Sequence, residues 1–208
     1  MTAQRSDTIL FTGDEYSLIG WIGGPLASPA QFGMETEMMS TACYRGFYAT
    51  YELTEEALYL RELTLSLSRL REIYDDGSVA EEKDYLPIGG IEPAKEKHQA
   101  TYHGLSEVIP FTGKIRLAKN FIAEFDMERE GGSPIAFKTV LDITLKDGRI
   151  VESKDRSQEL KQQRGAYMKS HDRWSMLQTI NKAFRLDMDS ETGGTSPQKK
   201  AWWQIWKL

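Results

Sequence analysis

The chain of 208 residues is 40% hydrophobic and 11% aromatic, which is sufficient for the core of one domain. Its formal net charge of −5 excludes a general attraction to nucleic acid or to an anionic membrane, and favours a basic partner. One cysteine, no signal-like start and no run of about 20 apolar residues predict a cytoplasmic protein without an internal disulfide or a membrane span.

Two short strands are predicted near the start of the chain. Residues 8–11 and 16–22 are typical of a hairpin, with a polar, glycine-containing turn at residues 12–15 between them. Residues 25–40 are expected to be irregular, because two prolines and a glycine interrupt any regular pattern.

A second hairpin is predicted in the middle of the first half. Residues 47–53 alternate between apolar or aromatic and polar side chains, as a half-buried strand does. In the following strand, residues 58–67, the apolar positions change parity after residue 60. A strand changes faces only through an extra residue, so we expect a bulge near Arg61 and Glu62.

Arg45 stands just before this hairpin among aromatic residues. An arginine in such a place is either held for structure, by stacking or a buried ion pair, or placed to bind an anion. If Arg45 binds an anion, we expect a β-barrel that binds or acts on a small anionic molecule. Its cavity would be lined by Arg45, Tyr48, Tyr51 and His103.

Residues 75–98 are expected to form a long surface loop, because they combine mixed charge with several glycines and prolines. Residues 101–108 and 114–121 are the next predicted strands. If residues 121–130 continue as a strand, four carboxylates lie on one of its faces: Glu124, Asp126, Glu128 and Glu130. This acidic row is a solvated edge strand, a docking face for a basic partner or, as a third alternative, a cation site.

The second half of the chain changes from strands to helices. Residues 136–146 and 149–154 form a predicted hairpin, and helices are predicted at about 157–170 and 172–186. Residues 1–188 are therefore expected to form one α+β domain. Its sheet is a mostly antiparallel sandwich or open barrel with two C-terminal helices.

Residues 189–208 are predicted to be a flexible linker and a Trp-rich tail. Its tryptophans, Trp202, Trp203 and Trp206, carry too much apolar area to remain in water. We expect them to dock on their own domain, on another protein or a second copy, or at a membrane interface.

No catalytic motif is present in the sequence. It contains no Gly-x-Ser-x-Gly elbow and no Walker-type loop, and its three histidines lack partners at metal-ligand spacing. Basic and aromatic residues do not alternate across a strand platform as single-stranded nucleic acid would require. We therefore expect no catalytic residues, no metal, no cofactor and no nucleic-acid partner. Sequence spacing does not test for pairs of carboxylates that come together only in the folded structure.

The run TACYRGFYATYE at residues 41–52, followed by Leu-Tyr-Leu at residues 58–60, resembles a pattern in small bacterial proteins of unknown function. Its core is a Thr-Ala-x-Trp/Tyr-Arg-Gly-Tyr/Phe strand motif. The resemblance extends over residues 8–156 and implies a bacterial, stand-alone, β-rich domain without an assigned activity.

These observations give three functional hypotheses. The first is a non-enzymatic interaction protein of the bacterial cytoplasm, in its most concrete form an immunity protein that neutralises a basic toxin. The second is the small-anion β-barrel, and the third is a self-assembling protein that docks through its tail. A protein partner is expected in the first and third, and a small-molecule ligand in the second.

Overall fold

The computed structural model describes residues 4–67, 85–96, 99–125, 132–170 and 172–186. Within these ranges the chain forms ten strands, two α-helices and three short 3-10 turns. The strands are β1 (Asp7–Phe11), β2 (Asp14–Gly23), β3 (Phe47–Leu53), β4 (Leu58–Leu65), β5 (Ala94–Lys95), β6 (Ala100–Tyr102), β7 (Glu107–Val108), β8 (Gly113–Phe121), β9 (Phe137–Lys146) and β10 (Arg149–Asp155). The helices are α1 (Ser157–Lys169) and α2 (Arg173–Ala183), and the 3-10 turns are η1 (Pro29–Phe32), η2 (Ala123–Phe125) and η3 (Pro134–Ala136).

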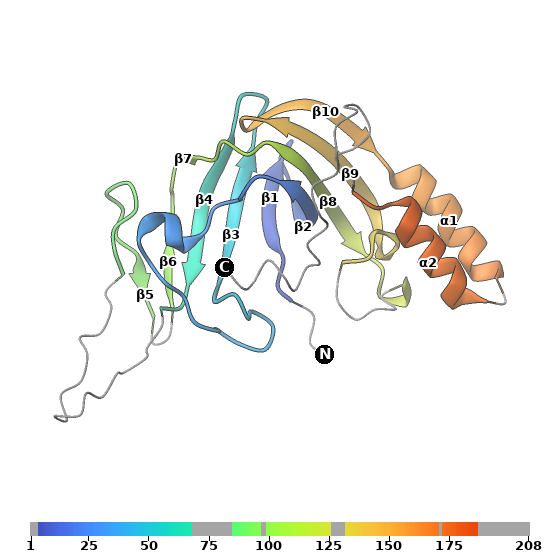
Figure 1. Ribbon diagram of the computed structural model, residues 1–208, viewed down its shortest axis with the longest axis horizontal. Coiled ribbons are helices and arrows are strands. Elements are labelled where there is room, and N and C mark those ends of the chain that lie inside the picture. Colours follow the sequence, from blue (N-terminus) through green and yellow to red (C-terminus); the bar gives the residue numbers. More distant parts are fainter. Residues whose placement is uncertain (1–3, 68–84, 97–98, 126–131, 171, 187–208) are drawn as a thin grey trace, which may run out of the picture.

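All ten strands belong to one sheet with the order β10-β9-β8-β2-β1-β3-β4-β6-β5, and β7 pairs with β4 (Figure 1). Every pair is antiparallel except β1 with β3, where Thr8 lies opposite Thr50 in a parallel register. The α+β class, the mostly antiparallel sheet and the two C-terminal helices are confirmed.

The bulge predicted in the central hairpin is present in β4. Thr50 pairs with Glu62 while the next residue, Tyr51, pairs with Leu60, so Arg61 is the extra residue. Leu60 and Leu63 are both fully buried, whereas Arg61 and Glu62 between them are partly exposed. The bulge therefore directs two adjacent charged side chains to the side of the sheet opposite the leucines.

One side of the sheet, which we call the inner face, carries the main core. Tyr51, Tyr102 and Phe111 are its largest fully buried side chains. The segment between β2 and β3 lies across this face in Figure 1 and adds Leu26 and Met34 to the core. Buried side chains therefore fill the space between the inner face and the segment that covers it.

The turn between β9 and β10 helps to curve the sheet. Gly148 donates its amide to the carbonyl of Phe111 (2.8 Å), and Ile109 donates to the carbonyl of Leu58 in β4 (2.8 Å). A β-carbon on Gly148 would lie 2.8 Å from the Ile109 carbonyl oxygen, so the close approach requires glycine there. These contacts draw one end of β9 and β10 toward β4, in the manner of an open barrel.

The opposite side of the sheet, the outer face, is divided into two halves. Over β8 and β9, helices α1 and α2 cover Ile19, Ala118 and Val140 with a second core of side chains that includes Leu160 and Leu177. We call this the covered half. Over β1, β3 and β4 no helix or strand of the described ranges packs on the outer face, and we call this the open half (Figure 1).

The strand continuation considered for residues 121–130 is not found at residues 122–125. Asn120 adopts a left-handed backbone (φ 62°), which an asparagine tolerates, and β8 ends at Phe121. The chain then turns through η2, which buries Phe125 in the second core. Glu124 therefore lies in a 3-10 turn and not in a strand row. Asp126, Glu128 and Glu130 lie outside the described residues.

Two other predictions are modified. The strand expected at residues 101–108 is interrupted, because Gly104 takes a left-handed backbone (φ 70°) and separates β6 from β7. The described end of the predicted 75–98 loop is not entirely superficial, since Ile88 is only 2% exposed and belongs to the inner core.

The two helices follow their predicted limits closely. The Asp172 side chain accepts a hydrogen bond from the Ser175 amide (3.0 Å), which caps the start of α2 as expected. Neither helix is long and apolar enough to cross a membrane, as judged over the part of the chain that the structure describes. The predicted tail, including Trp202, Trp203 and Trp206, lies outside these residues.

Candidate functional site

The four residues proposed to line a small-molecule cavity are distributed over three places. Tyr48 and His103 lie on the open half of the outer face, Tyr51 lies in the inner core, and Arg45 lies ahead of β3 beside the start of β1. The structure therefore brings only Tyr48 and His103 to the same face of the sheet.

Arg45 is held for structure. Its guanidinium forms a two-pronged ion pair with Asp7, whose side chain is 2% exposed, and its Nε donates to the Phe47 carbonyl (2.7 Å). Asp7 also accepts the amide of Ala49 (2.7 Å), so the pair joins β1 to β3. A guanidinium engaged in this way has few donors left for a bound anion.

Tyr51 and Cys43 are buried beside this ion pair. The Tyr51 hydroxyl lies 3.5 Å from the Ala27 carbonyl, and burial raises the pKa of Tyr51 well above its usual value. The Cys43 thiol donates to the Phe47 carbonyl (3.3 Å), and burial raises the pKa of Cys43 as well. A thiol kept protonated by burial is a poor nucleophile at neutral pH.

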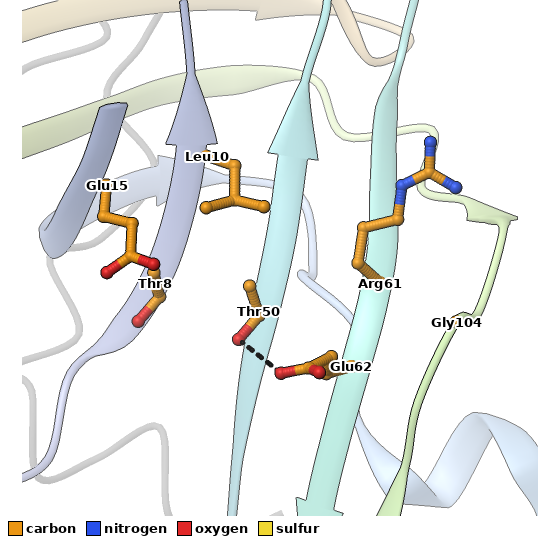
Figure 2. Close-up of a pocket in the computed structure, with 7 residues that line it drawn as sticks. All are labelled: Thr8, Leu10, Glu15, Thr50, Arg61, Glu62 and Gly104. Carbon is orange, nitrogen blue, oxygen red and sulfur yellow. Dashed lines mark hydrogen bonds between the residues drawn. The ribbon is translucent and has the colours of Figure 1, made fainter. Parts of the chain in front are cut away.

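A shallow depression of about 370 Å³ lies on the open half of the outer face. Figure 2 shows Glu15 and Thr8 on one side of it, Arg61 and Glu62 on the other, and Leu10 and Thr50 between them. None of its lining residues is fully buried, so the depression is open to solvent. The lining residues are Thr8, Leu10, Glu15, Thr50, Arg61, Glu62 and Gly104.

Strand register explains why these residues meet. One row of outward positions crosses the sheet at right angles to the strands, and its polarity changes along the way. Pairing connects, in order, Val140, Ala118, Ser17, Thr8, Thr50 and Glu62. The first two are fully buried under the helices, the next three are small hydroxyl residues, and the last carries charge.

Glu62 ends this row beside a histidine. Its Oε1 lies 2.8 Å from Nδ1 of His103, and its Oε2 lies 3.5 Å from the Thr50 hydroxyl. The side chains of Glu62 and His103 are 46% and 61% exposed. Both therefore remain accessible to a partner that approaches the open half.

Arg61, the bulged residue, is fixed on the same face. Its guanidinium pairs with Glu52 (2.6 Å), donates to the Ser106 hydroxyl (2.8 Å) and lies 4.7 Å from the centre of the Tyr59 ring. A second arginine, Arg5, stacks 3.4 Å from the centre of the Tyr48 ring. The open half thus presents flat guanidinium and aromatic surfaces beside its carboxylates.

A second depression, of about 250 Å³, continues from the first toward the end of β8. The two share Thr8 and Glu15, and the second extends past Ser17 to Phe121. Nearby, the hydrogen bond from Lys119 to Asp14 (2.7 Å) raises the pKa of Lys119, which therefore keeps its charge. Glu124 follows Phe121 by three residues in the sequence and lines neither depression.

The covered half is not available in the same way. Arg116, only 4% exposed, forms a two-pronged ion pair with Asp142 and donates to the carbonyl of Phe184 after α2. Arg156 also pairs with Asp142 (3.5 Å) and stacks 4.6 Å from the Phe184 ring. These contacts attach the helices to the sheet.

The open half offers hydrogen-bond acceptors and stacking surfaces rather than an enclosed reaction site. Carboxylates such as Glu15 and Glu62 accept ammonium and guanidinium donors, and the tyrosine–arginine pairs stack with planar groups. No group of three or more histidine, cysteine or acidic side chains in the described ranges is placed to hold a metal ion.

The sequence indicated Tyr48 and His103 but not the residues between them. Glu15, Thr8, Thr50 and Glu62 have the composition of any solvated strand face, so residue type alone did not distinguish them. The strand alternation did place Thr50 on the side opposite Tyr51, and the predicted bulge included Glu62 without assigning it to a face. The missing information was that no helix of the described ranges covers this part of the outer face.

No protein-family model matches the chain, and neither the curated proteins nor the solved structures contain a match. The resemblance to small bacterial proteins accordingly stays a prediction.

Proposed function

We propose that the chain is a non-enzymatic bacterial interaction protein that docks a basic protein partner on the open half of its outer sheet face. An immunity protein that neutralises a basic toxin is the most concrete form of this function. The observation that carries the proposal is the open, polar and aromatic half-face next to a half that helices cover.

Charge supports a basic partner. The chain has a net charge of −5, and the carboxylates of Glu15 and Glu62 stand on opposite sides of the first depression. Lysine and arginine side chains of a partner would pair with them, and the partner's planar groups would stack on Tyr48 and Tyr59. Complementary charge of this kind speeds association and makes it dependent on salt.

The shape of the site also favours a polypeptide. Small-molecule sites usually enclose most of their ligand within an apolar cavity. Here the depression is shallow, its lining is polar, and the two depressions form a groove along the face. Protruding side chains of a partner fit such a surface better than an enclosed ligand does.

The small-anion alternative has less support. Arg45, its proposed anion anchor, is engaged by Asp7, and Tyr51 is enclosed in the inner core. Only Tyr48 and His103 remain on a common face, without the arginine that motivated the hypothesis.

Partner capture tests the proposal. The immobilised chain is exposed to a bacterial lysate, and bound proteins are identified by mass spectrometry at low and high salt. The charge reversal Glu15→Lys/Glu62→Lys is compared with Glu55→Lys/Glu56→Lys, which makes the same charge change at two exposed positions in the β3–β4 turn.

We expect wild type and the turn variant to retain the same basic partner. The face variant is expected to lose at least about tenfold in affinity, because two favourable charge contacts become repulsive. Equal retention by both variants, with circular dichroism showing both folded, would remove the open half from the proposal.

A further inference from the structure

We propose that the last ten residues, 199–208, dock on the open half of the outer face of their own chain and cover it when no partner is bound. The proposal extends the function above by naming the resting occupant of the same face. It rests on that function only for the identity of the face.

The described chain ends on the outer face. After α2, the carbonyl of Phe184 accepts a hydrogen bond from Arg116, which fixes the chain over β8. Leu186 then lies over Gly20 of β2, so closely that a β-carbon on Gly20 would be 3.2 Å from its Cδ1. β2 is the direct neighbour of β1, where the open half begins.

The remaining chain is long enough to reach the open half. Fifteen residues separate Leu186 from Trp202, and a segment of that length spans up to about 50 Å when extended. Three strand intervals separate β2 from β4, which is only about 14 Å at the usual spacing between strands. Residues 199–208 can therefore lie anywhere along the groove.

The chemistry of the segment complements that of the face. Residues 199–208 contain three tryptophans and three lysines and no acidic side chain. The open half supplies the Glu15 and Glu62 carboxylates for the lysines. It also supplies the Arg5–Tyr48 and Arg61–Tyr59 stacks, on which indoles pack well.

Attachment to the same chain favours this docking. A tethered segment meets its site at an effective concentration in the millimolar range, so even weak contacts keep the face occupied. A basic partner must then displace a basic, aromatic segment from the same carboxylates. Competition of this kind would reject weak partners and admit a tight one.

Quenching of tryptophan fluorescence by acrylamide tests the proposal on the full chain without any partner. Wild type is compared with Glu15→Lys/Glu62→Lys and with the turn control Glu55→Lys/Glu56→Lys. Trp21 and Trp174 contribute equally to all three proteins. The quenching constant is expected to rise about twofold in the face variant, because three of the five tryptophans become exposed.

Wild type should show the same rise when salt is added, since acrylamide is uncharged and salt screens the lysine–carboxylate pairs. The turn control should match wild type. Identical quenching in all three proteins, with no response to salt, would overturn the proposal.

Sedimentation over a range of concentrations distinguishes docking of residues 199–208 on their own chain from docking on a second copy. Shielding in a monomer supports docking within one chain. Shielding that appears only as the protein dimerises would overturn it and assign the segment to a second copy. Because the assay contains no partner, its failure leaves the capture result unaffected, and failed capture leaves this assay unaffected.

Discussion

The two halves of the outer face belong to one continuous sheet and differ in what lies on them. Along a single row of paired positions, Val140 and Ala118 are fully buried under α1 and α2, whereas Thr50 and Glu62 remain accessible. The inner face behind both halves carries a mostly apolar core. The outward side chains therefore change from apolar to polar where the helices no longer cover the sheet.

The charged residues of the two halves have different roles. On the covered half, charged groups are paired with one another under the helices, as Arg116 is with Asp142. On the open half, Glu62 and His103 pair in contact with solvent. Charges in the first place maintain the fold, and charges in the second place are available to a partner. Each prediction below separates these two roles.

The largest effect is expected from Asp142→Ala on the covered half. It leaves Arg116 buried without its carboxylate, and breaking a buried pair costs about 3–5 kcal/mol of unfolding free energy. Urea denaturation measures this loss. Asp14→Ala is the matched control, because it removes a carboxylate that is 54% exposed and pairs with Lys119, so its cost should stay below about 1 kcal/mol. Similar losses for the two variants would contradict the comparison.

Truncating a buried side chain of α2 comes next. Leu177 is 2% exposed in the second core, so Leu177→Ala should lower the unfolding free energy by about 2–5 kcal/mol. Thr50→Ala, on the open half, should change it by no more than about 0.5 kcal/mol. A larger loss for Thr50→Ala than for Leu177→Ala would contradict the difference between the covered and the open half.

The pH dependence of stability distinguishes the buried Cys43, just before the central hairpin, from the accessible Thr50 on the outer face. Burial raises the pKa of Cys43 above its ordinary value of 9.0, so the folded state retains the thiol proton more strongly than the unfolded state. The associated stability is fully present below pH 9. It is lost as the pH rises toward the folded pKa, at up to about 1.4 kcal/mol per pH unit.

Denaturation midpoints between pH 8 and 10.5 measure this slope. Cys43→Ala should flatten the curve, while Thr50→Ala should leave its slope unchanged. The interpretation fails if Cys43→Ala retains the full wild-type slope.

The smallest effect is expected from the acidic residues that follow Glu124 in the sequence. Reversing Asp126 and Glu128 should weaken partner capture by less than the Glu15/Glu62 reversal does. These residues were proposed as a docking face, and Glu124 of the same segment lies in a turn rather than in a strand row. Capture that depends on Asp126 and Glu128 alone would transfer the partner site to this segment.

Local patterns predicted much of the fold. Alternation located β3, the change of parity among the leucines located the bulge at Arg61, and Asp172 marked the start of α2. Patterns failed where a single backbone conformation decided the outcome, as at Asn120, which ends β8.

The site was harder to predict than the fold. Tyr48 and His103 were selected, but with Arg45, whose partner Asp7 is 38 residues away in sequence and reaches it only through the parallel pairing of β1 with β3. Glu62 resembles any surface carboxylate until the positions of the helices are known. Sequence patterns report which residues point outward, and only the tertiary arrangement reports which of them are covered.

Zero-length carbodiimide cross-linking of the captured complex tests whether the partner lies on the open half, because it joins a carboxylate of this chain to a partner lysine in contact with it. The account predicts cross-links from Glu15 and Glu62, with Glu159 beside the covered half unreacted. Cross-links confined to Glu159 and its neighbours, with none at Glu15 or Glu62, would contradict it.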